Sequence, residues 1–173
     1  MGDKFEQLLN LIGKPENDPA FKLFAAQLDD KPAIHGSICT FWNGGLMFLS
    51  QKRIIRFVAV DVSQDDSGEV EEFLPAGIRI GDNRREVQIK LGGKPIKSEE
   101  AEWVNEKQLW DIYEMGPYTF TVILDADSQI IQSVRLQDEF DEEIDLESYR
   151  AAPPRVRRYR LGQRRDVRHR GDS

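Results

Sequence analysis

The sequence predicts an α+β protein made of two repeated helix–β-meander units, which form one mainly antiparallel sheet with the helices on one face. Three observations predict this class. A helix ending in Gly-Lys-Pro occurs twice, at residues 13–15 and 93–95; three strand-like runs follow each copy; and a polar stretch separates the copies. A three-stranded meander is marginally stable alone, so one shared sheet is favoured, with two facing sheets as the alternative.

The first unit, residues 1–62, is expected to begin with two helices. Apolar side chains recur at helical spacing over residues 5–12, and Gly13 ends that helix. Asp18 followed by Pro19 is typical of a helix N-terminus. The elements expected next are a second helix to residue 28, strands near 40–42, 46–49 and 53–60, and a hairpin turn at Asn43-Gly44.

The second unit, residues 74–150, repeats this order after an acidic linker at residues 63–73. Asp82 or Asn83 is expected to cap its helix, and Glu86, three residues after Asn83, fits a capping box. The expected elements are a helix over 86–91, strands near 109–113, 118–122 and 129–134, and hairpin turns at 116–117 and 125–128.

Charge is distributed unevenly along the chain. The whole sequence has a net charge of −7, but residues 151–173 hold eight Arg against two Asp, so residues 1–150 carry −13. The Arg-rich tail has few apolar side chains and is predicted to be disordered. A body this acidic should repel nucleic acid and attract basic partners, so only the tail is a candidate for binding nucleic acid.

Three features of the sequence bear on the cellular compartment of the protein. No apolar run approaches the roughly 18–20 residues of a membrane span, so no membrane partner is expected. The first residues lack the layout of a signal peptide. Cys39 is the one cysteine, which excludes an internal disulfide and favours a reducing compartment. The sequence therefore predicts a soluble, cytoplasmic protein.

No set of side chains predicts catalysis or a cofactor. His35 and Cys39 lie four residues apart, but a zinc site needs three or four ligands, and the second histidine, His169, lies in the tail. We interpret His35 and Cys39 as structural and predict no catalytic residue, no metal site and no cofactor.

The candidate partner-binding residues are acidic, together with one tryptophan. A charge run is commonly a solvated surface, and paired carboxylates can also hold a metal, so those alternatives stay open. The interleaved Phe140, Ile144, Leu146 and Tyr149 favour partner binding, since apolar anchors can dock while charges steer. The candidates are Asp65, Asp66, Glu69, Glu71, Glu72, Trp103, Asp138, Glu139, Asp141, Glu142, Glu143, Asp145 and Glu147.

A motif in the second unit carries a resemblance. Residues 77–95 combine Gly-Ile, Gly-Asp-Asn-Arg, Glu-Val and Leu-Gly-Gly-Lys-Pro, and residues 122–134 read VILDADSQIIQSV. This pattern resembles the BamE-like (SmpA/OmlA) fold, a helical pair packed on a three-stranded meander, over about residues 74–136 and more loosely over 5–60. BamE proteins are lipoproteins, and this chain has no lipidated cysteine, so the resemblance implies a fold alone.

Size, acidity and the helix–meander pattern also resemble immunity proteins encoded beside bacterial toxins. That resemblance implies a non-catalytic protein that neutralises a cognate toxin by occlusion, and a basic nuclease is one candidate for that toxin. The alternatives are an adaptor that uses the sheet and the Arg-rich tail, and an enzyme of unrecognised type. An open sheet edge would also allow a homodimer.

Overall fold

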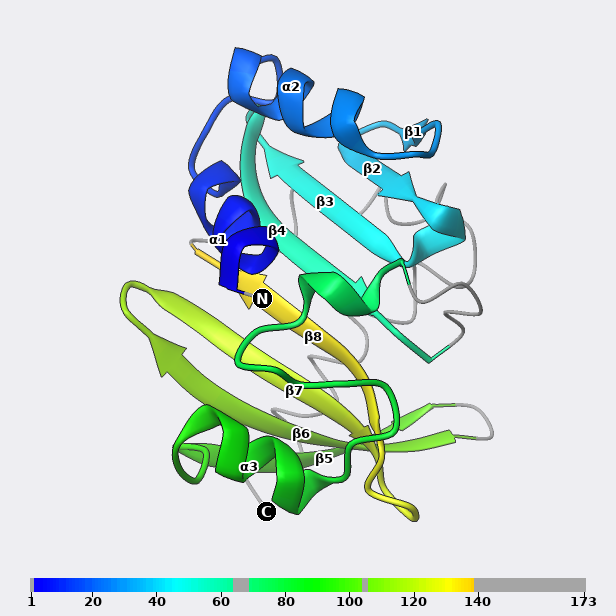
Figure 1. The fold of residues 1–173 in the computed structure, drawn as a ribbon, viewed down its shortest axis with the longest axis vertical. Coiled ribbons are helices and arrows are strands. Elements are labelled where there is room, and N and C mark those ends of the chain that lie inside the picture. The colour runs from blue at the N-terminus through cyan, green and yellow to red at the C-terminus, as the bar shows by residue number, and fades with distance from the viewer. Residues whose placement is uncertain (1, 64–68, 104–105, 139–173) are drawn as a thin grey trace.

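A computed structural model describes residues 2–63, 69–103 and 106–138, and shows an α+β fold with one eight-stranded antiparallel sheet (Figure 1). The strand order is β1-β2-β3-β4-β8-β7-β6-β5. The first half contributes α1 (Gly2–Leu11), α2 (Pro19–Gln27), β1 (Ala33–His35), β2 (Ile38–Phe41), the 3-10 turn η1 (Trp42–Gly44), β3 (Leu46–Gln51) and β4 (Ile54–Asp61). The second contributes η2 (Glu71–Phe73), α3 (Arg84–Leu91), β5 (Lys97–Trp103), β6 (Glu106–Met115), β7 (Tyr118–Asp125) and β8 (Ile131–Gln137).

Helices α2 and α3 begin at the caps that the sequence predicts, whereas α1 begins at Gly2, before the expected apolar run at residues 5–12. The Asp18 carboxylate accepts a hydrogen bond from the Ala20 N–H at 2.8 Å, at the start of α2. At α3, Asn83 and Glu86 form the expected capping box: the Glu86 N–H donates to Asn83 Oδ1, and the Asn83 N–H donates to Glu86 Oε1. Gly92 ends α3 with φ at 87°, a conformation that glycine adopts without strain.

The hairpin turns also match the expected positions. The β2–β3 connection contains Asn43-Gly44, with Asn43 at φ 54° and Gly44 at φ 91°. Gly116 and Pro117 join β6 to β7, and Gly116 has φ 60° there, as the first position of a type II′ turn requires. Two strands were not expected from the sequence: the short β1 and the acidic β5, which lie at the two edges of the sheet.

One shared sheet is confirmed, and the alternative of two facing sheets is wrong. The halves join where β4 pairs with β8, from Phe57 opposite Gln137 to Asp61 opposite Ser133. Each half supplies a four-stranded meander, but the first supplies two helices and the second one. The duplication of a repeated unit therefore stays a prediction.

The main core lies between the helices and one face of the sheet. Phe5 of α1 packs edge-on against Phe120 of β7, with ring centroids 5.9 Å apart, and Phe24 of α2 packs in the same way against Phe48 of β3. Val87 of α3 belongs to the same buried cluster. All three helices therefore cover one face of the sheet, and one core serves both halves (Figure 1).

We call the opposite face of the sheet the back face. Its apolar side chains form two buried clusters, Ile38, Met47, Leu49, Phe57 and Ala59 in the first half and Ala101, Trp110 and Ile123 in the second. Arg135 of β8 lies between them, with its guanidinium 4.8 Å from the Phe57 ring and 5.0 Å from the Trp110 ring. The back face is thus one continuous band across the sheet.

Candidate functional site

The predicted acidic linker ends in a short structured segment that includes two candidate residues. Glu71 and Glu72 form the first turn of η2, while Val70 and Phe73 on either side are buried in the main core. These two apolar side chains hold the segment against the body, so the positions of the carboxylates are fixed by the fold. Glu69 is exposed just before this segment.

A shallow pocket of about 440 Å³ lies against η2. Leu74 and Ile78 give it apolar walls, and both are buried in the core behind it. The pocket combines these apolar walls with charged side chains at its rim. It would therefore suit a partner side chain that has both an apolar and a charged part. Its lining residues are Lys4, Glu71, Glu72, Leu74, Gly77, Ile78 and Arg79.

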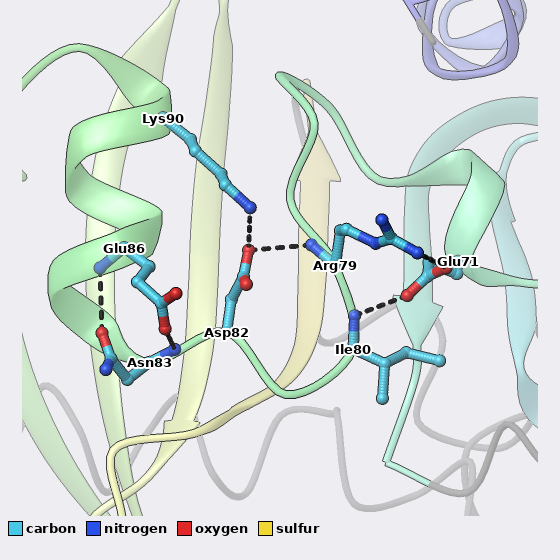
Figure 2. Close-up of polar contacts among 7 residues, drawn as sticks. All are labelled: Glu71, Arg79, Ile80, Asp82, Asn83, Glu86 and Lys90. Carbon is cyan, nitrogen blue, oxygen red and sulfur yellow. Dashed lines mark hydrogen bonds and ion pairs between the residues drawn. The ribbon is translucent and has the colours of Figure 1, made fainter.

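The two carboxylates at this pocket are held differently. Glu71 accepts a hydrogen bond from the Ile80 N–H at 2.7 Å and lies 4.0 Å from the Arg79 guanidinium, so it fixes the loop that precedes α3 (Figure 2). Glu72 pairs with Lys4 at 2.6 Å, and its side chain is 61% exposed. An ion pair this exposed contributes little to stability, so Glu72 can exchange its partner readily.

A second carboxylate holds the same loop from the other side. Asp82 accepts hydrogen bonds from the Arg79 N–H at 2.9 Å and from the Lys90 ammonium at 2.6 Å (Figure 2). Ile80, between the two anchored points, is 41% exposed. The loop therefore presents an apolar side chain from a fixed backbone, beside the acids of η2.

The structure does not bring Asp138 into this pocket. Its carboxylate pairs with Arg56 at 3.0 Å, and its N–H donates to the Arg56 carbonyl at 3.0 Å. Arg56 belongs to β4 and is not among the residues that line the pocket. Asp138 is thus tied to the central strands of the sheet.

Several predicted site residues lie outside the described residues. The backbone of Trp103 forms the last residue of β5, but its side chain lies outside the described part of the structure. The others are Asp65, Asp66, Glu139, Asp141, Glu142, Glu143, Asp145 and Glu147, with the Arg-rich tail and His169.

The environment of Cys39 disfavours a nucleophile. Burial, with a smaller contribution from Glu16, raises the pKa of the Cys39 thiol to about 11, so the thiol stays protonated at neutral pH. His35 pairs with Ile38 at the hairpin between β1 and β2. Within residues 2–63, 69–103 and 106–138, no three His, Cys, Asp or Glu side chains gather as a metal site would need.

A buried ion pair in the second half was not expected from the sequence. Arg84 Nε and Nη2 donate to the two carboxylate oxygens of Asp111 at 2.8 and 2.9 Å, and Ser98 Oγ donates to the same carboxylate at 2.7 Å. Burial and the Asp111 charge raise the pKa of the neighbouring Tyr113 to about 12. These partners lie up to 27 residues apart, so no local motif could have identified them.

None of the described helices is both long and apolar enough to cross a membrane. No protein-family model matches the chain, and no curated protein matches it significantly.

Three solved structures resemble the chain at a distance. An extracellular protein containing a SCP domain from Bacillus anthracis has a TM-score of 0.46 at 12% identity, over 76% of this chain and 45% of that one. A cysteine-rich secretory protein from Staphylococcus aureus has a TM-score of 0.44 at 11% identity, over 75% of this chain and 44% of that one. A DUF4309 family protein from Bacillus subtilis has a TM-score of 0.40 at 16% identity, over 62% of this chain and 68% of that one. The chain spans less than half the length of the first two, and likenesses this distant assign no function.

Proposed function

We propose that this chain is a non-catalytic binding protein of the immunity type, which acts in the cytoplasm and neutralises a cognate basic bacterial toxin by occlusion. The observation that carries the proposal is the pocket at η2, where Glu71 and Glu72 with Lys4 and Arg79 surround apolar walls, next to the exposed Ile80 whose N–H bonds to Glu71, on a body of charge −13. Apolar anchors beside charged side chains are typical of surfaces that bind protein partners, and the net negative charge of the body favours a partner of the opposite sign.

The mechanism is steric and electrostatic. The charge of the body would raise the rate of encounter with a basic partner, and the effect would weaken as salt screens it. Glu72 would exchange Lys4 for a cation of the partner, while Ile80 would bury its side chain against the partner. Glu71 and Asp82 would keep the loop rigid and reduce the entropy lost on binding.

The experiment is a capture of partners from the native host with the full tagged chain, at low and at physiological salt. We expect one stoichiometric basic partner whose retention falls as salt rises, and whose toxic activity the chain blocks at equimolar ratio. The double variant Glu72→Gln/Ile80→Ala should weaken capture. Glu114→Gln, an exposed acid on β6, is the matched control and should not.

Two results would contradict this proposal. One is that no partner is retained at either salt. The other is that retention depends on the Arg-rich tail and is unaffected by the pocket variants, which would favour the adaptor instead.

A further inference from the structure

The back face of the sheet is buried although no described helix lies on it. The eight apolar side chains of its two clusters are 0–2% exposed in the first half and 0–3% in the second. Polar side chains on the same face are buried as well, with Ser133 and Gln108 at 0% and Arg135 at 3%. An uncovered sheet face leaves such side chains open to water, so this face has a cover.

The cover must be broad. The two clusters and Arg135 together involve every strand from β2 across the sheet to β5. All three helices pack on the other face, in the main core. The band crosses the sheet from β2 to β5, and neighbouring strands lie roughly 4.8 Å apart. Segments as short as residues 64–68 and 104–105 cannot extend over that width. That leaves the chain after Asp138.

We propose that the back face is the docking surface of this chain's own C-terminal segment, residues 139–173. The described chain ends beside the face: β8 is a central strand, and the N–H of Asp138 still bonds to the Arg56 carbonyl of β4. A segment of 35 residues, which can extend by roughly 3.3 Å per residue, is long enough to cross the sheet more than once.

The composition of the segment suits the surface. Its large apolar residues, namely Phe140, Ile144, Leu146, Tyr149, Val156, Tyr159, Leu161 and Val167, are spread along its length. Residues 151–173 carry +6 from their eight Arg and two Asp, and they would be attracted to residues 1–138, which carry −8; residues 139–150 between them carry −5. A second copy of the chain fits less well, because two chains that each carry −7 repel each other, and because these side chains are already buried within one copy.

The test places a reporter thiol on the back face. Ser133 is 0% exposed, and its hydroxyl has no hydrogen-bond partner among the described residues, so Ser133→Cys is a mild change. The native Cys39 packs against the core on the helix side and serves as the internal control. A protease site inserted after Asp138 allows the segment to be cut from the folded full chain and removed.

In the uncut chain, we expect the thiol at position 133 to resist a maleimide reagent. After the segment is cut and removed, its labelling rate should rise by more than about tenfold, while that of Cys39 stays the same. Adding peptide 139–173 should restore protection, and a scrambled peptide should not. Rapid labelling in the uncut chain, or unchanged protection after removal of the segment, would overturn the proposal.

A second measurement decides the matter if cutting unfolds the protein, which rapid labelling of Cys39 would reveal. Lys97 is 56% exposed and shares its side of β5 with Ala101. A photo-crosslinking residue at position 97 of the uncut chain should capture residues 139–173 of the same molecule, in a mixture of isotopically heavy and light protein. Capture of another copy, or of residues 1–138 alone, would refute the proposal.

Discussion

At the scale of single residues, the pair of Arg84 and Asp111 is the clearest energetic feature of the second half. The Asp111 side chain is 2% exposed, and its two oxygens are bound by one planar guanidinium and one hydroxyl. A buried carboxylate depends on such partners, because removing one of them leaves an uncompensated charge.

Replacing Arg84 with Met should therefore lower the free energy of unfolding by about 3–5 kcal/mol, measured by urea denaturation. The double variant Arg84→Met/Asp111→Leu should recover most of the loss, since it removes the stranded charge. Arg85→Met, at the exposed neighbouring position, is the control and should change stability little. Equal losses for the Arg84 and Arg85 variants would refute this account of the ion pair.

The sequence predicted those side chains whose partners lie close in the chain. The bond from the Glu86 N–H to Asn83 spans three residues, and that from the Ala20 N–H to Asp18 spans two, so spacing alone indicated them. The contact that holds the Ile80 backbone against η2 is a hydrogen bond to Glu71, nine residues before it, and it depends on a loop shape that no motif encodes. The linker acids were therefore recognised as candidates, while Ile80 and Arg79 were not.

At the scale of elements, α3 depends on its ends because it has only eight residues. Helices this short are marginal without caps and packing. Val87 supplies the packing, and Asn83 with Glu86 supplies the N-terminal cap (Figure 2).

Replacing Asn83 with Ala should lower the free energy of unfolding by about 1 kcal/mol and speed hydrogen exchange in the first turn of α3. Both effects follow from the loss of the acceptor for the Glu86 N–H. Asn83→Ser keeps an acceptor oxygen and should stay within a few tenths of a kcal/mol of the parent. If the Ala and Ser variants exchange at the same rate, the cap does not stabilise this helix.

The strands that the sequence did not predict are those with weak apolar patterns. Residues 97–103 read KSEEAEW, and a run this acidic is typical of a solvated surface. Here β6 provides the partner backbone, and the charges suit an edge strand because they discourage pairing with other chains. Strand β1 has only three residues, too few for a periodicity to emerge.

At the scale of the whole molecule, one core joins the two halves. Leu8 and Phe48 of the first half share a buried cluster with Phe120 and Leu136 of the second. Neither half can therefore lose its packing without exposing the other, and we expect them to unfold together.

Single-tryptophan variants test this coupling. Trp103→Phe/Trp110→Phe leaves Trp42 in the first half, and Trp42→Phe/Trp103→Phe leaves Trp110 in the second. Within each variant, the fluorescence midpoint in urea should coincide with the far-UV circular dichroism midpoint. Two separated transitions would mean that the halves fold independently, as two autonomous repeats would.

The pairing of β4 with β8 also has a consequence for synthesis on the ribosome. Strand β4 is complete once residue 61 is made, but its partner β8 ends at residue 137 and is the last of the described strands to emerge. Until then, the nascent chain presents the edge of β4 without its native neighbour, and such edges template wrong pairings. The pairing that joins the two halves therefore waits for β8, and chaperones that bind nascent chains would protect this protein best before that strand emerges.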